Sequence, residues 1–313
     1  MKKLFIIGNG FDSAHKLPTK YSDFREFLYE ECDGQISYMP ATHMGRDCDT
    51  IADRETTAGL LIDLIDDTTR GDNWEDFEDA MGRYQYLSYF DDYGMDEAMA
   101  ANDDDEVYRT IYNREDIVSE LSCCILEVKN LFSEWIDSID VSIAKPQARF
   151  MKLFDDETEF LTFNYTNTLE TVYNISKSKI CHIHGEQGEA IIVGHGVEEN
   201  PYLEETWKTF VINDCLRRMF DELKKDVCGC FYEHSDFFQR VKLSEIEDIY
   251  SIGFSFSEPD LFYICQLCKL IDTKKVTWHL AKFDEKNKDN EIYINRIKDC
   301  GFKGKFGKLI PNK

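Results

Sequence analysis

The sequence predicts an α/β fold of the doubly wound, Rossmann-like type, in which helices cover both faces of a mostly parallel sheet. Short apolar runs without strict alternation recur along the chain, as expected for strands that are buried on both faces. Amphipathic helical patterns follow several of these runs, and glycine or polar residues stand where the runs end. The 313 residues are enough for such a domain and a sizeable insertion.

Six apolar runs are candidate strands. The four clearest cover residues 4–7, 159–163, 190–193 and 248–252, and the two weaker ones cover residues 180–183 and 276–280. A helical pattern with apolar residues at i, i+3 and i+4 begins at Ser22. Another helix is expected to begin after Ser257, because a serine cap followed by Pro259 and Asp260 is typical of a first turn. Strands alternating with helices indicate a doubly wound sheet.

An acidic block interrupts this alternation. Residues 31–115 contain 23 acidic and 6 basic side chains, in a chain whose formal net charge is −25. Between residues 46 and 145 there are helical patterns but no convincing strand, including one apolar stripe formed by Val118, Leu121, Ile125, Val128, Phe132 and Trp135. We therefore expect residues 1–45 and 146–313 to form one nucleotide-binding α/β domain, with residues 46–145 as a helical insertion.

Composition and charge argue against several classes of function. The net charge of −25 disfavours extended binding to nucleic acid or to an anionic membrane, and we interpret residues 269–313, with 12 basic and 6 acidic side chains, as a charged terminal segment. No apolar run approaches the roughly 18 residues of a membrane span. The first apolar run stops at Gly8, too early for a signal peptide, and the 11 scattered cysteines show no disulfide framework. We expect a cytoplasmic protein.

The first candidate site follows the first predicted strand. Gly8-Asn9-Gly10-Phe11-Asp12 contains two glycines, which let the backbone turn sharply and approach a diphosphate at the start of a helix. A tight turn that needs glycine for packing is an equal alternative, because one G-x-G is not specific. Asp12 is placed either to hydrogen bond a ligand hydroxyl or to cap the helix.

The second candidate site follows the predicted strand of residues 159–163. Asn164 stands at its end, where a carboxamide can hold a ribose hydroxyl or a water molecule but cannot act as a base. Asparagine is also common in turns and caps, and a helix is expected to start at Thr166 or Asn167.

The third candidate site is the histidine pair in His182-Ile183-His184-Gly185. On a strand the two histidines would point to the same face, with His184 as a general base and Gly185 leaving room for a ligand. A buried, hydrogen-bonded histidine is the alternative for His182. The pair could also bind a metal ion together with His195, but no acidic partner is evident, so we expect no metal.

Two further motifs complete the candidate residues. Gly253 and Ser255 follow the predicted strand of residues 248–252, where N–H groups and hydroxyls can contact a ribose or phosphate. In the acidic block, Glu75 and Glu78 lie three residues apart on one helical face, and Glu78 is a candidate catalytic acid, with a solvated acidic face as the alternative. The shared position of four motifs at strand ends is more informative than any single motif.

The ordered set of motifs resembles the bacteriophage abortive-infection AbiH family. It comprises GNGFD, LPTKYSDF, NWEDFE, TFNYTNTLE, HIHG, GHG and GFSFSEPD, and it extends from residue 3 to about residue 260. That family is in turn similar to the Sir2-like NAD-binding fold. By this comparison the glycine loop at residues 8–10 and residues 162–166 stand at the Gly-Ala-Gly loop and the asparagine motif of Sir2-like proteins. Residues 184–185 stand at their His-Gly pair, and residues 253–255 at their late Gly-x-Ser loop.

The resemblance implies an antiphage protein that cleaves NAD to nicotinamide and ADP-ribose, as defence proteins with Sir2-like domains tend to do. Asn164 would position a water molecule or the ribose hydroxyls, and His184 would act as a base or hydrogen-bond partner. Gly8, Gly10 and the N–H groups near Phe11 would bind the diphosphate. The other expected nucleotide contacts are Asn9, Asp12, Thr162, Gly185, Gly253 and Ser255.

Departures from the Sir2 pattern keep other functions open. Thr166 replaces an aspartate of the asparagine motif, and the cysteines lack the two Cys-x-x-Cys pairs that hold zinc in Sir2 deacetylases. A non-catalytic sensor of NAD or ADP-ribose is therefore one alternative, and a metal-dependent nuclease that uses the histidines is another. A phage-derived trigger and a homo-oligomer are compatible with the sequence, which determines neither.

Overall fold

The computed structural model describes residues 2–36, 40–46, 50–68, 74–83, 86, 104–203, 210–281 and 289–309. The chain forms two compact units, each assembled from separate stretches of sequence. The first unit comprises Met1–Lys20, Ser133–Ile192 and Asp226–Lys313, and the second comprises Tyr21–Phe132 and Val193–Lys225. The expected boundaries differ from these units. Residues 46–132 of the expected insertion lie in the second unit and residues 133–145 in the first, while residues 21–45 and 193–225, which were expected in the α/β domain, belong to the second unit.

The first unit contains a six-stranded parallel sheet with the order β5-β4-β1-β6-β7-β8. Its strands are β1 (Lys3–Ile7), β4 (Thr158–Thr162), β5 (Ile180–His182), β6 (Asp248–Ile252), β7 (Thr277–Ala281) and β8 (Lys305–Leu309). Numbered within this unit the order is 3-2-1-4-5-6, which is that of dinucleotide-binding α/β folds. Ile7 pairs with Thr162 and with Ile252, so the residues that follow these three strands meet at one edge.

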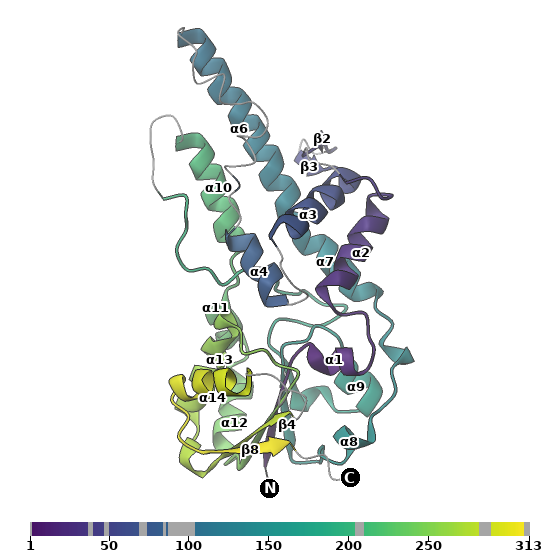
Figure 1. Ribbon diagram of the computed structural model, residues 1–313, viewed down its shortest axis with the longest axis vertical. Coiled ribbons are helices and arrows are strands. Elements are labelled where there is room, and N and C mark those ends of the chain that lie inside the picture. Colours follow the sequence, from purple (N-terminus) through teal and green to yellow (C-terminus); the bar gives the residue numbers. More distant parts are fainter. Residues whose placement is uncertain are drawn as a thin grey trace. The chain divides into compact units, whose positions relative to one another are not determined.

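Two apolar cores cover the two faces of this sheet. Leu4 and Ile6 belong to one core and Phe5 and Ile7 to the other, because successive side chains of a strand alternate. The first core includes residues of α11 (Val227–Glu233), α12 (Ser235–Leu243), α13 (Glu258–Leu270) and α14 (Asp289–Asp299). The second includes residues of α1 (Gly10–Ala14), α8 (Ala148–Met151) and α9 (Thr168–Tyr173). The predicted doubly wound sheet is therefore confirmed (Figure 1).

Three short 3₁₀ helices complete the first unit as described, namely η2 (Val141–Ile143), η3 (Lys177–Lys179) and η4 (Thr273–Lys275). Helix α13 begins as predicted, with Ser257 at its N-cap and Pro259 in the first turn. The Ser257 hydroxyl donates to Asp260 Oδ2 at 2.9 Å. Helix α9 likewise begins with Asn167 at its N-cap.

One predicted strand is a loop, and one strand was not predicted. Residues 190–193 form no strand. Instead the Ile192 N–H donates to the His184 carbonyl oxygen at 2.8 Å, and the Ile192 carbonyl oxygen accepts from the Tyr165 hydroxyl at 3.0 Å. Strand β8, with the charged sequence KFGKL, extends the sheet beyond β7. An edge strand is bonded on one side only and does not need the apolar composition of a central strand.

Cysteines of the first unit lie mostly in the first core. Burial raises the pKa of Cys181 and of Cys268 to about 12, so both thiols stay protonated and act as small apolar side chains. Cys265 of α13 is joined to Cys300 by a disulfide, which the scattered cysteine pattern did not suggest.

The second unit is mainly helical where it is described. Its helices are α2 (Tyr21–Glu31), α3 (Arg54–Thr68), α4 (Trp74–Arg83), α6 (Asp104–Leu126) and α10 (Phe210–Leu223), while α7 (Val128–Ser138) spans the boundary between the units in sequence. Helix α2 packs on α3, and α10 packs on α6. The predicted long helix is interrupted at Glu127, although all six residues of its apolar stripe are buried.

A small hairpin corrects the expectation that residues 46–145 contain no strand. It pairs β2 (Thr42–Met44) with β3 (Thr50–Ala52) in antiparallel orientation. Strands of three residues, largely exposed, are too short to produce a recognisable alternation in the sequence.

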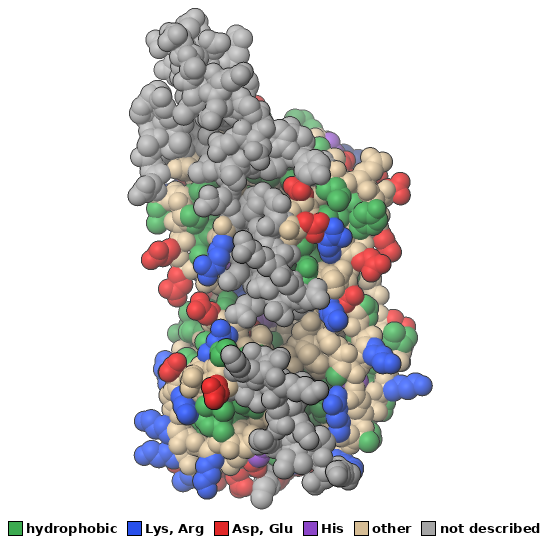
Figure 2. All heavy atoms as spheres, viewed as in Figure 1, with side chains coloured by type: hydrophobic (Ala, Val, Ile, Leu, Met, Phe, Trp, Pro, Cys, Tyr) green, Lys and Arg blue, Asp and Glu red, His purple; other side chains and the backbone are tan. Residues whose placement is uncertain are grey.

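The described surface carries charges of both signs. On the face shown in Figure 2, acidic and basic side chains are interspersed among the residues drawn in colour. None of the helices in the described ranges is both long and apolar enough to cross a membrane.

Candidate functional site

The loops that follow β1 and β6 pack directly on each other at the carboxyl edge of the sheet. The Gly8 N–H donates to the Ile252 carbonyl oxygen and the Gly10 N–H to the Gly253 carbonyl oxygen, both at 3.0 Å. A Cβ on Gly8 would lie 2.5 Å from the Gly253 oxygen, and a Cβ on Gly10 would lie 2.6 Å from the Gly253 Cα. Gly253 itself has a φ of +64°, so all three positions require glycine.

This packing indicates what the first motif does. The N–H groups of Gly8 and Gly10 are engaged by the neighbouring loop, and the Phe11 N–H donates to the Gly8 carbonyl oxygen at 2.9 Å. The Phe11 ring is buried against Phe150 in the second core, and Asn9 is partly buried. A diphosphate at this loop would therefore need other hydrogen-bond donors. Of the two explanations for the glycines, the geometry supports a tight turn that needs glycine for packing.

Asp12 lies beneath the same loop with its carboxylate buried at 1% exposure. The Thr166 hydroxyl donates to its Oδ2 at 2.5 Å, and the Thr168 hydroxyl donates to its Oδ1 at 2.8 Å. Burial raises the pKa of Asp12 from the ordinary value of 3.8 to about 6, against the opposing effect of these hydrogen bonds. The carboxyl group can therefore exchange a proton near neutral pH. Its two oxygens accept from hydroxyl groups of the protein itself, whereas the expected partners were a ligand hydroxyl or the start of the helix.

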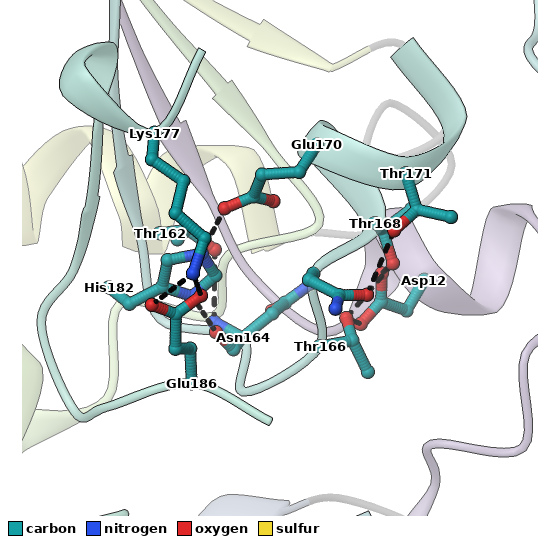
Figure 3. A network of polar contacts seen from close by, with 11 residues as sticks. Asp12, Thr162, Asn164, Thr166, Thr168, Glu170, Thr171, Lys177, His182 and Glu186 are labelled. Atoms are coloured by element: carbon teal, nitrogen blue, oxygen red, sulfur yellow. Dashed lines mark hydrogen bonds and ion pairs between the residues drawn. The ribbon is translucent and has the colours of Figure 1, made fainter. Parts of the chain in front are cut away.

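Asn164 is held by hydrogen bonds of its backbone, while its side chain is buried beside Asp12. Its N–H donates to Thr162 Oγ1, and its carbonyl oxygen accepts from His182 Nδ1, both at 3.1 Å. The residue is only 7% exposed, and its carboxamide has no well-formed hydrogen bond with the described residues, although it lies close enough to the Asp12 carboxyl group to lower the pKa of that group. Figure 3 shows Asn164 between the Asp12 group and the His182 group.

A buried carboxamide without a well-formed hydrogen bond is a candidate ligand contact. Leaving a buried polar group unpaired destabilises a protein by about 1–3 kcal/mol, and most buried polar groups are therefore paired with protein or ordered water. Asn164 offers one acceptor and two donors at the end of β4, next to the central strand. This position is where open α/β sheets bind ligands.

His184 lies in an aromatic, nearly closed environment at 3% exposure. Its Nε2 is 3.2 Å from the Tyr263 hydroxyl and 3.8 Å from Asp260 Oδ1, and its ring contacts those of Phe163 and Tyr263. Burial raises the pKa of the Tyr263 hydroxyl far above its ordinary value, so this tyrosine stays neutral. The His184 ring therefore lies beside a neutral hydroxyl group and a carboxylate.

The expectation that His182 and His184 face the same side is wrong. Strand β5 ends at His182, and a turn begins at the next residue, so strand alternation does not extend to His184. His182 Nε2 lies 2.9 Å from Glu170 Oε1 of α9, whereas His184 contacts Tyr263 of α13, in the core on the other face. Gly185, with a φ of +87°, completes the turn, and a Cβ there would collide with the Ala190 carbonyl oxygen.

Other candidates lie elsewhere. Ser255 is exposed in the loop after β6. Glu78 belongs to the second unit, where its Oε1 accepts from the Nζ of buried Lys225 at 2.6 Å. His195, also in the second unit, has its Nε2 3.0 Å from the Phe220 carbonyl oxygen. The side chain of Glu75 lies outside the described residues. The three histidines of the nuclease hypothesis thus have separate protein partners.

Several residues of the site were missed by the sequence reasoning. Thr168, Tyr263 and Asp260 contact Asp12 or His184 from distant parts of the chain. Thr168 and Glu170 had a weak signal, since both belong to the TFNYTNTLE motif. The contact of Glu170 with His182 could not be predicted, because the pairing of β4 with β5 brings the two residues together.

Comparison with known proteins gives one match. A family model described as bacteriophage abortive infection AbiH matches residues 4–282. The matched range includes β1, β4, β5 and β6 with the loops that follow them, and therefore all the strand-end residues described above. No curated protein matches the sequence, and no solved structure does.

Proposed function

This chain belongs to the bacteriophage abortive infection AbiH family, and we propose that it serves antiphage defence by cleaving NAD to nicotinamide and ADP-ribose. The first unit would be the catalytic part. The proposal combines the family, the strand order of a dinucleotide-binding sheet and the resemblance of the strand-end motifs to Sir2-like proteins.

One observation carries the proposal, namely the buried carboxamide of Asn164, which has no well-formed hydrogen bond with the described residues. It lies at the carboxyl edge of the sheet, beside a buried carboxyl group whose pKa is about 6. Hydrolysis of the bond between nicotinamide and ribose requires little covalent chemistry from a protein, because the transition state resembles an oxocarbenium ion. The protein must orient the ribose and a water molecule and accept one proton.

The residues can be given roles that balance this reaction. The water oxygen adds to the ribose carbon, the bond from that carbon to the pyridinium nitrogen breaks, and its electron pair neutralises nicotinamide. One proton is released from the water. Asn164 would hold the ribose hydroxyls or the water, Asp12 would accept the proton, and His184 with Tyr263 would hydrogen bond the ribose.

The test is release of nicotinamide by the purified chain. We expect product from NAD, alone or with lysate of phage-infected cells, and losses of about 100-fold or more for Asn164→Ala and His184→Ala. Asn130→Ala is the matched control, since Asn130 is an exposed asparagine of α7 in the second unit. Absence of nicotinamide under every condition, or equal rates for all three variants, would exclude the proposal.

A nucleotide sensor without turnover is the second candidate. Thr166 stands where the Sir2 pattern has an aspartate, and its hydroxyl is bonded to Asp12 rather than directed at a ligand. Calorimetry separates the two functions. Tight binding of NAD or ADP-ribose with the ligand recovered intact supports the sensor, and heat that continues as turnover supports the enzyme.

A further inference from the structure

A second polar group lies in the first unit, next to the Asn164 site. Glu170 of α9, His182 at the end of β5 and Glu186 in the following loop each direct one ligand atom to a common point, and these three atoms lie within 4.8 Å of one another. They line a cavity of about 630 Å³. Figure 3 shows the three side chains converging beside Lys177.

The hydrogen bonds of His182 determine which of its ring nitrogens is available to a metal ion. Its Nδ1 faces the backbone carbonyl oxygen of Asn164 at 3.1 Å, which can only accept, so Nδ1 carries a hydrogen. Its Nε2 faces a carboxylate oxygen of Glu170 at 2.9 Å, which also only accepts. Nε2 is therefore the ring nitrogen that can bind a metal ion together with the Glu170 carboxylate.

The surroundings of Glu170 also support a metal ion at this point. Its Oε2 is fully buried and has no hydrogen-bond partner among the described residues, while its Oε1 faces His182. A ligating histidine that donates its other N–H to a backbone carbonyl is the usual arrangement around protein-bound metals. One imidazole and two carboxylates are ligands for first-row divalent ions such as Mn²⁺ and Zn²⁺.

Glu186, the third proposed ligand, forms an ion pair with Lys177, and the Lys177 side chain is exposed. Its Nζ bonds both Glu186 carboxylate oxygens, at 2.9 and 3.0 Å, but its side chain is 69% exposed. An exposed ion pair of this kind contributes at most about 1 kcal/mol, so Glu186 can exchange it for a metal ion. Ligand atoms bound to one such ion lie about 2.0–2.2 Å from it, which requires only a small closure of the three side chains.

We propose that Glu170, His182 and Glu186 bind one divalent transition-metal ion. The ion binds Nε2 of His182 and leaves Nδ1 bonded to the Asn164 carbonyl oxygen. It therefore fixes the loop that carries the Asn164 carboxamide, and the three ligands are positioning residues for that loop. The site differs from the three-histidine metal set considered from the sequence, because two of its ligands are carboxylates and only His182 is shared.

The test uses Mn²⁺ with the full chain after chelator treatment. Mn²⁺ is suited to carboxylate and imidazole ligands rather than to the free thiols of this protein. The free ion gives a six-line paramagnetic resonance signal that disappears on binding. We expect one tight site, weakened at least 10-fold by Glu186→Gln and by Glu170→Gln and abolished by His182→Ala. Lys177→Met, which removes the competing ammonium, should bind several-fold more tightly.

The control is Glu189→Gln, which removes an exposed carboxylate from the same cavity but not from the ligand set. It should bind Mn²⁺ like the unaltered chain. Equal weakening by Glu189→Gln and Glu186→Gln, or an unchanged tight site in His182→Ala, would overturn the proposal. Circular dichroism identifies a variant that has not folded, and Glu186→Gln, in a loop, keeps the test valid if His182→Ala does not fold. The binding measurement contains no NAD, so its failure is distinct from failure of the proposed enzyme.

Discussion

Replacing Asp12 by asparagine should make the protein more stable and the enzyme inactive. The Asp12 carboxyl group is buried, and its pKa is raised from 3.8 to about 6. Below pH 4 the folded and unfolded states both bind the proton. As the pH rises, the unfolded chain releases it first, so the folded state loses stability until the pH passes about 6.

The size of this loss follows from the pKa. At about 1.36 kcal/mol for each pKa unit, ionisation of Asp12 destabilises the folded state by about 3 kcal/mol at pH 7–8 and by about half of that at pH 5. Asparagine has the shape of the acid without its charge. Thr166 and Thr168 can bond its oxygen and its nitrogen, since a hydroxyl group both donates and accepts.

Urea denaturation at pH 5 and pH 8 measures the effect. We expect Asp12→Asn to exceed the unaltered chain in free energy of unfolding by about 3 kcal/mol at pH 8 and by clearly less at pH 5, with nicotinamide release lost. Asp156→Asn, which alters an exposed carboxylate, should change little at either pH. A destabilised Asp12→Asn variant at pH 8, or a difference that does not grow with pH, would refute the reasoning.

Two further predictions concern stability. Gly253→Ala should destabilise the fold by several kcal/mol in thermal or urea denaturation, because its Cβ would collide with Gly10. The control is Gly188→Ala, at a φ of +84° but with open space around it, which should lose only about 1–2 kcal/mol. Equal losses in the two variants would contradict the packing of the two loops. Lys225→Met should destabilise the second unit by about 3–5 kcal/mol, because it removes the buried ammonium group that pairs with the Glu78 carboxylate. Adding Glu78→Leu should restore much of this loss in a double-mutant cycle. Additive effects of the two substitutions would show that the ion pair does not couple Lys225 to Glu78.

The sheet could be predicted from the sequence because its central strands are apolar on both faces. Residues 4–7 and 248–252 were identified closely, and they are β1 and β6. Periodicity could not distinguish the apolar loop at residues 190–193 from a strand, since both are buried in part. It also missed β8, whose charges are tolerated at the edge of the sheet.

The location of the site could be predicted from the sequence, but the contacts between its residues could not. Polar residues at strand ends identified Asn164 and His184 as candidates, because parallel strands bring their carboxyl ends together. The sequence could not show that Asp12 bonds Thr166 and Thr168, which stand more than 150 residues away. Nor could it show that β5 ends before His184, which depends on a turn at Gly185.

The account rests most directly on contact between a nucleotide and the Asn164 carboxamide. Equilibrium binding of NAD to the intact chain, compared with Asn164→Ala and Asn130→Ala, tests this contact whether the ligand is cleaved or only sensed. We predict that Asn164→Ala weakens binding at least 10-fold. Loss of one hydrogen bond between uncharged groups costs about 1.4 kcal/mol, which corresponds to a tenfold change in affinity. Asn130→Ala should bind as the unaltered chain does. Equal affinity of all three proteins for NAD, or no binding by any of them, would contradict the account.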